Sequence, residues 1–136
     1  MVEPHSLPHR HLRSRTEGGV LVSTITEPQL LGDKLVHALR QELMAVSAQP
    51  GTRKIVLDLQ PVKVLASEAF RPLLTLRRTV QERGGQLVLC NLAPTVAKVL
   101  HDTRLISTSR SSGAVFDVQT DVAAALASLA DPAAEQ

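Results

Sequence analysis

Ser67 and Glu68 are the two neighbouring residues whose types and position offer chemistry to this chain. They supply one hydroxyl group and one permanent negative charge. An apolar run at residues 54–59 precedes them, and a helical pattern follows them. A strand that feeds a helix through a tight turn presents the free N–H groups of the helix at the carboxyl edge of the sheet, where α/β proteins commonly place functional residues. This turn is therefore the candidate functional site.

The local pattern gives both residues a plain structural role. Ser67 is well placed to cap the following helix, with its oxygen accepting an N–H group two or three residues on. Glu68 falls in the first turn, where the helix dipole stabilises a carboxylate by about 0.3–1 kcal/mol at an exposed site. Arg71, Arg77 and Arg78 give the same helix a basic flank, which is a solvated face or the border of an interface.

Alternating strand and helix patterns surround the turn. Apolar and β-branched composition predicts strands at 9–16, 20–26, 54–59, 86–92 and 114–118, with a short apolar segment at 62–65. Apolar spacing of three to four residues predicts helices at 31–46, 67–83, 94–100 and 120–129. In the first helix the stripe is Leu31, Leu35, Leu39 and Leu43, Pro94 suits a first helical turn, and Thr120 is the expected cap of the last helix.

This order predicts an α/β fold with a mixed, mostly parallel sheet of four to five strands and about four helices. The 136 residues suit one domain, which we assign to residues 9–130. We expect residues 1–8 to form a disordered N-terminal arm and residues 131–136 to form a disordered tail, because both are polar or proline-bearing ends.

Composition excludes several classes of protein. No apolar run approaches the roughly 20 residues needed to span a bilayer, and the first residues lack the apolar segment of a signal peptide. The single cysteine, Cys90, cannot form an intrachain disulfide and lies in a predicted strand, where a buried core residue is expected. We therefore expect a cytoplasmic protein without direct membrane insertion.

The basic charge balance does not indicate a nucleic-acid partner. Residues 1–15 carry a net charge of +2, and the rest of the chain has 12 basic and 12 acidic residues. The chain contains no Trp, no Tyr and only two Phe residues, so it lacks a stacking platform for single-stranded bases. We expect no nucleic-acid binding by the folded domain.

Metal, cofactor and catalytic sites also find no support in the sequence. His5, His9 and His11 lie in or beside the predicted arm, where we expect them to have no carboxylate or cysteine partner in a folded site. His101 sits beside Asp102 near a predicted helix end, where an imidazole suits the dipole. The glycine pairs precede no lysine-bearing phosphate loop, and no nucleophile and base are placed together, so we expect neither a cofactor nor an enzyme.

Several short sequence segments, taken in their order and spacing, resemble those of a known family. They are the segments at 19–26, 55–59, 66–70, 82–87 and 92–100, with a closing strand and helix at 116–129. Together they resemble the STAS domain family of bacterial anti-sigma factor antagonists over roughly residues 10–130. The resemblance implies a non-catalytic module that binds a protein partner.

In that family the turn reads Asp-Ser-Ser/Thr-Gly, and a partner anti-sigma kinase phosphorylates the second hydroxyl. Here Ala66 replaces the aspartate, Ser67 keeps the first serine, Glu68 occupies the phosphoacceptor position and Ala69 replaces the glycine. The resemblance thus implies a degenerate motif that is not phosphorylated at the usual position. Glu68 then either mimics a phosphorylated hydroxyl or only stabilises the helix through its dipole. For Ser67, phosphorylation is the alternative to helix capping.

The resemblance further implies that the partner binds the turn and the helix that follows, over residues 66–78. The residues expected to contact it are Ala66, Ser67, Glu68, Ala69, Phe70 and Arg71. Asp58, in the apolar strand, matches an acidic position of the family and is expected to hold the turn by hydrogen bonds.

The implied partner is an anti-sigma factor or a histidine-kinase-like ATPase. The alternative is a STAS-type scaffold or a transporter-associated subunit, whose binding surface needs no phosphorylation. The sequence carries no indication of the oligomeric state.

Overall fold

The computed structural model describes residues 11–49, 51–103 and 116–130. Within them the chain forms a five-stranded sheet, a separate pair of two-residue strands, four α-helices and one 3₁₀ turn. The predicted arm at 1–8 and tail at 131–136 lie outside the described residues.

The five-stranded sheet has the order β1-β2-β4-β6-β7. Its strands are β1 (Leu12–Glu17), β2 (Val20–Ile25), β4 (Lys54–Asp58), β6 (Gln86–Cys90) and β7 (Asp117–Gln119). β1 runs antiparallel to β2 through a turn at Gly18 and Gly19, and the other neighbours run parallel. The predicted α/β class and the mixed, mostly parallel sheet are confirmed.

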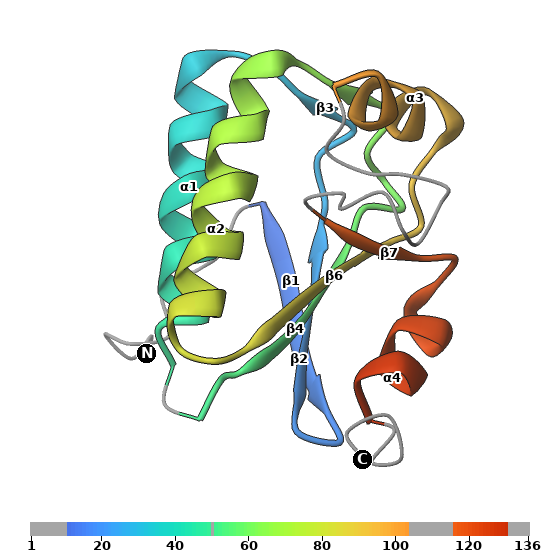
Figure 1. Cartoon of the computed structure of the whole chain (residues 1–136). Coiled ribbons are helices and arrows are strands. Elements are labelled where there is room, and N and C mark those ends of the chain that lie inside the picture. The colour runs from blue at the N-terminus through green and yellow to red at the C-terminus, as the bar shows by residue number, and fades with distance from the viewer. Residues whose placement is uncertain (1–10, 50, 104–115, 131–136) are drawn as a thin grey trace.

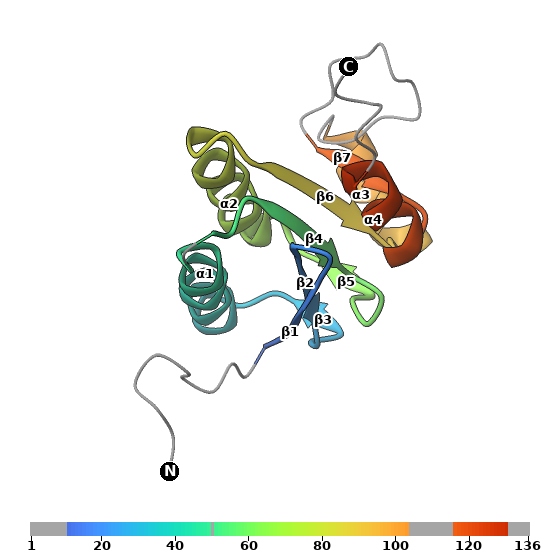
Figure 2. The same cartoon turned by 90° about the horizontal axis from the view of Figure 1, so that it is seen from below.

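Helices cover both faces of this sheet. The four α-helices of the described residues are α1 (Asp33–Ser47), α2 (Phe70–Glu82), α3 (Pro94–Asp102) and α4 (Val122–Ala130). α1 and α2 lie side by side against one face, and α4 lies against the other (Figures 1 and 2). Pro94 is the first residue of α3, as expected for a residue with no N–H group to offer.

This two-sided covering explains why the central strands read as continuous apolar runs. In β4, Ile55 and Leu57 belong to the core cluster that includes α1 and α2. Val56, between them, packs in the second cluster with Ala125 and Leu129 of α4. Successive side chains of a strand point to opposite faces, and here both faces are buried.

A two-stranded parallel sheet lies apart from the larger one and brings the starts of two helices together. β3 (Gln29–Leu30) pairs with β5 (Val64–Leu65) and leads into α1. β5 leads through the 3₁₀ turn η1 (Ser67–Ala69) into α2. In the short apolar segment at 62–65, the last two residues form β5.

The prediction that α1 begins at Leu31 was wrong. Leu31 precedes the helix and is 44% exposed, whereas Leu30 is fully buried in β3. The pairing of β3 with β5 keeps the chain extended as far as Leu30. Gly32 then turns the chain with a φ of 94°, a backbone conformation that favours glycine, and α1 begins at Asp33.

The predicted cap of the last helix also lies one residue too early. The Oδ1 atom of Asp121 accepts the N–H group of Ala124 at 2.8 Å, so Asp121 caps α4. Thr120 instead continues the strand pairing, because its carbonyl accepts the N–H group of Asn91 at 3.2 Å.

Candidate functional site

The turn at Ser67 and Glu68 lies where the first turns of α1 and α2 meet. The small β3–β5 sheet feeds both helices from the same end, so residues that are far apart in the sequence become neighbours there. The N–H group of Ala66 donates to the carbonyl of Leu30 at 3.0 Å and extends this pairing to the edge of η1. The turn is thus held against the chain that enters α1.

The carboxylate of Glu68 bridges the two helix starts. Its Oε2 atom accepts the N–H group of Gly32, the residue just before α1, at 2.8 Å. The pKa of Glu68 is lowered, first by this hydrogen bond and then by one from its own backbone N–H group. The side chain is exposed, so its charge is both fixed in place and open to a partner.

Ser67 is exposed and is the first residue of η1, but it caps no helix. The residue before η1 is Ala66, the residue before α2 is Ala69, and neither η1 nor α2 has a side-chain cap. The predicted capping role was wrong, because a single 3₁₀ turn separates β5 from α2. Ser67 therefore lies three residues ahead of the helix it was expected to cap.

The other expected contact residues divide into exposed and buried ones. Arg71 is exposed and Phe70 is half-buried, whereas Ala69 is fully buried in the core. Pro72 falls in the first turn of α2, where its missing N–H group costs the helix nothing. Ala66 is half-buried like Phe70, so the surface available at this site is made by Ala66, Ser67, Glu68, Phe70 and Arg71.

A groove of about 860 Å³ lies beside the turn, between the first two turns of α1 and of α2. Glu68, Phe70, Arg71 and Leu74 lie on one side of it. Leu74 is 37% exposed, one of the few large apolar residues at the surface of the described chain.

The opposite wall of the groove comes from α1, and the sequence analysis missed it. Asp33, Val36, His37 and Arg40 line this side. Their signal was present, because Asp33, His37 and Arg40 are spaced by four and three residues and so share one helix face. The apolar stripe of this helix points into the core and gives no sign of the face that lines the groove.

Asp58 is buried at the carboxyl end of β4 and gathers three donors. Its Oδ2 atom accepts the hydroxyl of Thr24 at 3.1 Å. Its Oδ1 atom accepts the backbone N–H group of Gln60 at 3.0 Å and the Nδ2 amide of Asn91 at 2.9 Å. The carboxylate therefore links the ends of β2 and β4 to the residue after β6, at the same end of the sheet as the turn.

His11 has carboxylate neighbours that the sequence does not place near it. Its Nδ1 atom lies 2.9 Å from Glu27, and its backbone N–H group donates to Glu42 of α1 at 2.9 Å. The expectation that it lacks such partners was wrong, because the fold brings together residues that are distant in the chain. Even so, no group of three or more His, Cys, Asp or Glu residues suited to a metal ion occurs in the described part of the chain.

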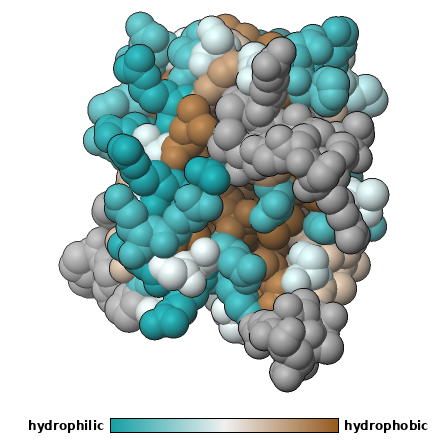
Figure 3. All heavy atoms as spheres, in the orientation of Figure 1, coloured by the Kyte–Doolittle hydropathy of each residue, from teal (hydrophilic) through white to brown (hydrophobic). Residues whose placement is uncertain are grey.

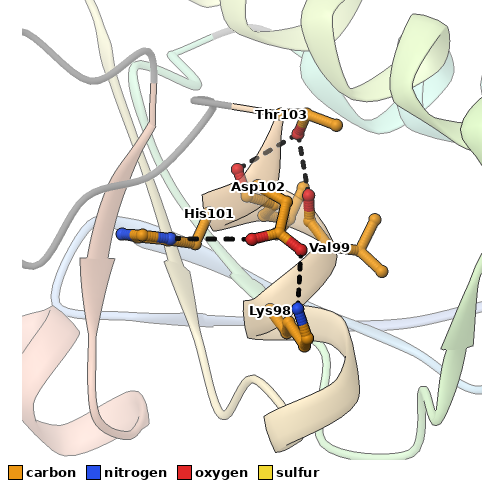
Figure 4. A network of polar contacts seen from close by, with 6 residues as sticks. Lys98, Val99, His101, Asp102 and Thr103 are labelled. Atoms are coloured by element: carbon orange, nitrogen blue, oxygen red, sulfur yellow. Dashed lines mark hydrogen bonds and ion pairs between the residues drawn. The ribbon is translucent and has the colours of Figure 1, made fainter.

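His101 belongs to an exposed network at the end of α3 (Figure 4). Its Nδ1 atom lies 3.9 Å from Asp102, whose carboxylate also accepts Lys98 Nζ at 2.8 Å. The hydrogen bond from Lys98 lowers the pKa of Asp102 and in turn raises the pKa of Lys98. This is a solvated helix-surface pair, and such pairs contribute little to stability.

Cys90 is fully buried on the face of the sheet that α4 covers. Burial raises the pKa of its thiol to about 12, with further contributions from the charges of Asp58 and Asp121.

The helices of the described residues include none long and apolar enough to cross a membrane.

Comparison with known proteins adds two relatives of different kinds. A protein named as the sulfate transporter 3.4 of Arabidopsis thaliana is 28% identical over an alignment of 113 residues that covers 77% of this chain and 17% of that protein. A protein named as the anti-sigma factor antagonist BtrV of Bordetella bronchiseptica is 31% identical over 64 residues, 47% of this chain and 55% of that protein. The chain thus spans about half the length of one relative and a small part of the other.

The fold matches a solved structure over nearly its whole length. An anti-sigma factor antagonist from Mycobacterium paratuberculosis superposes with a TM-score of 0.72 at 21% identity, covering 96% of this chain and all of that one. The family model of the STAS domain matches residues 12–123. From β1 to the start of α4, then, this chain is a member of the STAS domain family.

Proposed function

We propose that this protein is a non-catalytic interaction module of the anti-sigma factor antagonist type, and that it acts in the cytoplasm. Its partner surface is the turn with the first part of α2, over residues 66–78. The partner is an anti-sigma factor or a histidine-kinase-like ATPase. Similarity to BtrV and to the mycobacterial antagonist fold supports this class of partner.

The observation that carries the proposal is the bond between Glu68 and Gly32. At the position where antagonists of this family carry the phosphorylated hydroxyl, this chain has a carboxylate that is already held by a backbone N–H group, 2.8 Å away. The carboxylate is exposed, and the bond lowers its pKa below the ordinary value of a glutamate, which is already ionised at neutral pH. A fixed charge therefore stands where a reversible one is expected.

A constitutive interaction follows from this arrangement. A phosphate carries a charge of roughly −1.5 to −2 and three acceptor oxygens, so glutamate reproduces only part of it. No kinase can add phosphate to the Glu68 side chain, and the charge stays through the life of the protein. Binding is then controlled by the amount of partner or by another site, without a phosphorylation cycle at this residue.

The alternative is a scaffold or transporter-associated subunit. The match to part of a sulfate transporter supports it, because that protein is 28% identical to this chain over 77% of its length. In that case the same surface docks onto a larger assembly. The two functions predict different partners and the same binding face.

Affinity capture with the wild-type domain, followed by identification of the bound proteins, tests the proposal. The Glu68→Lys variant reverses the charge of the turn. Glu82→Lys makes the same change at an exposed residue near the end of α2, outside the proposed surface, and is the matched control.

We expect an anti-sigma factor or a histidine-kinase-like ATPase to bind wild type and Glu82→Lys, and to be lost with Glu68→Lys. Transporter subunits with the same dependence would replace the leading function by the alternative. Partner binding that is unaffected by either substitution would refute the proposed surface.

A further inference from the structure

The groove beside the turn has an unpartnered cation on each wall. Arg40 projects from α1 and Arg71 from α2, and both line the groove and are exposed. Neither guanidinium group has a hydrogen bond or ion pair with any of the described residues. A guanidinium group presents a rigid fork of donors that matches a carboxylate, so two free ones across a groove favour an anionic ligand group.

Between the two cations the groove is apolar. Leu74 is 37% exposed, Phe70 is half-buried, and Val36 of α1 lies opposite them. In Figure 3, hydrophilic side chains cover the side of the molecule where α1 lies, and a narrow apolar strip reaches the surface beside the upper part of α2, on the side away from α1. The groove therefore offers an apolar stripe with a positive charge on either side.

The negative charges lie at one end of the groove. Asp33 begins α1, and Glu68 lies in the turn ahead of α2. Arg40 is seven residues beyond Asp33, which is about 10 Å further along the helix at 1.5 Å per residue. Because Glu68 is held by Gly32, its charge cannot swing toward Arg71 without breaking that bond.

We infer that this groove binds an acidic amphipathic helix of the partner protein, with its apolar side on Leu74 and Phe70 and its carboxylates on Arg40 and Arg71. This inference rests on the proposed function and names the chemistry of its partner. Two helices with an apolar groove between them suit a third helix docked by residues at three-to-four spacing. The negative end of the groove sets the direction, since acidic residues of the ligand avoid Asp33 and Glu68.

The same polarity argues against nucleic acid in this groove. A nucleic-acid backbone carries its negative charges at regular, close intervals. Laid along the groove, it would place phosphates against Asp33 and Glu68 as well as against the two arginines. A protein helix can carry its carboxylates only at the positions that face Arg40 and Arg71.

A displayed library of amphipathic helices tests the inference. Each helix has leucines at i, i+3, i+4 and i+7, and its flanking positions are drawn equally from Glu, Lys and Gln. We expect selection on the wild-type domain to enrich Glu at the flanking positions. Enrichment of Lys, enrichment without charge preference, or no binder at all would overturn the inference.

Charge-reversal variants then locate the binding. The double variant Arg40→Glu/Arg71→Glu is expected to weaken a selected acidic helix at least about tenfold and to gain affinity for the matching Lys-flanked helix. Arg13→Glu is the matched control, because Arg13 is an exposed arginine of β1 that lies outside the groove and outside residues 66–78. Equal effects of the double variant and the control would overturn the inference.

The apolar contact is tested in the same way. Leu74→Ser is expected to weaken binding about tenfold. Leu31→Ser changes an exposed leucine outside the groove and is expected to leave binding unchanged. Self-association of the free domain that disappears with Leu74→Ser would show a second copy in the groove and would also overturn the inference.

These results are separable from those of the capture experiment. A captured anti-sigma factor that depends on Glu68 but ignores Arg40→Glu/Arg71→Glu would leave the proposed function standing and refute the acidic helix. Acidic helices that require both arginines, with no such partner captured, would support the groove chemistry and refute the proposed function.

Discussion

Replacing Asp58 with alanine should destabilise the domain by about 2–3 kcal/mol. The change removes the acceptor of three donors, namely Thr24, Gln60 and Asn91, and a typical hydrogen bond contributes about 1 kcal/mol. Gln60 lies at the surface, so its N–H group can bind water when the carboxylate is removed. Only the hydrogen bonds of Thr24 and Asn91 are then left without a replacement, which corresponds to the lower end of the range. Asp58 itself is 7% exposed, which leaves little room for water to replace the carboxylate.

Asp58→Asn should cost only about 1 kcal/mol. The Oδ1 atom of the new amide can still accept from Gln60 and Asn91. Its Nδ2 group then donates to Thr24, whose hydroxyl reverses its role and accepts. All three bonds survive, and the loss is limited to the extra strength that a charged acceptor provides.

Urea denaturation at neutral pH measures both changes. With a slope of roughly 1–3 kcal/mol per molar urea, the alanine variant should shift the midpoint by about 1 M or more, and the asparagine variant by about half of that. Asp117→Asn, at an exposed position of β7, is the control and should stay within about 0.5 kcal/mol of wild type. An alanine variant as stable as wild type, or an asparagine variant as damaged as alanine, would refute this account of the carboxylate.

Four further predictions concern the switch, the catalytic class, the arm and the thiol. Incubation with an anti-sigma kinase and ATP should add no mass to wild type, whereas Glu68→Ser creates a candidate acceptor; a phosphate on wild type that Ser67→Ala abolishes would identify Ser67 as the acceptor. The purified domain should hydrolyse neither ATP nor GTP, and turnover that vanishes with Glu68→Ala would contradict the non-catalytic reading. Deletion of residues 1–8 should change the free energy of unfolding by less than about 1 kcal/mol, because a polar terminus buries little apolar surface, and a larger loss would mean that the arm packs on the sheet. Cys90, with its pKa raised to about 12, should resist a thiol reagent at pH 8 in the native protein and react at once in urea; rapid native labelling would contradict its burial.

Continuous apolar patterns predicted the fold well, because burial on both faces leaves a signal in every residue. β4 and β6 were predicted within two residues of their ends, and the core face of α2 followed from its apolar spacing. The start of α1 was missed, since Leu31 fits the fourfold spacing of the leucines. Its position is decided by the pairing of β3 with β5, which depends on residues more than 30 positions away.

The sequence indicated the position of the candidate site but did not indicate its geometry. The turn at Ser67 was visible as the junction between a strand and a helix. The 3₁₀ turn that removes Ser67 from the helix cap has no distinct composition, and the α1 wall of the groove lies 30 residues earlier in the chain. Such contacts arise only when two separate helices are packed on one face of a sheet.

The hydrogen bond between Glu68 and Gly32 has a consequence for the evolution of this site. Its donor is a main-chain N–H group, so the bond does not depend on the chemistry of a partner side chain. Position 32 is restricted by its φ of 94°, which favours glycine, and not by the contact with Glu68. A change at position 68 therefore calls for no matching side-chain substitution in α1, and pairwise covariation between aligned sequences would give no sign of the contact.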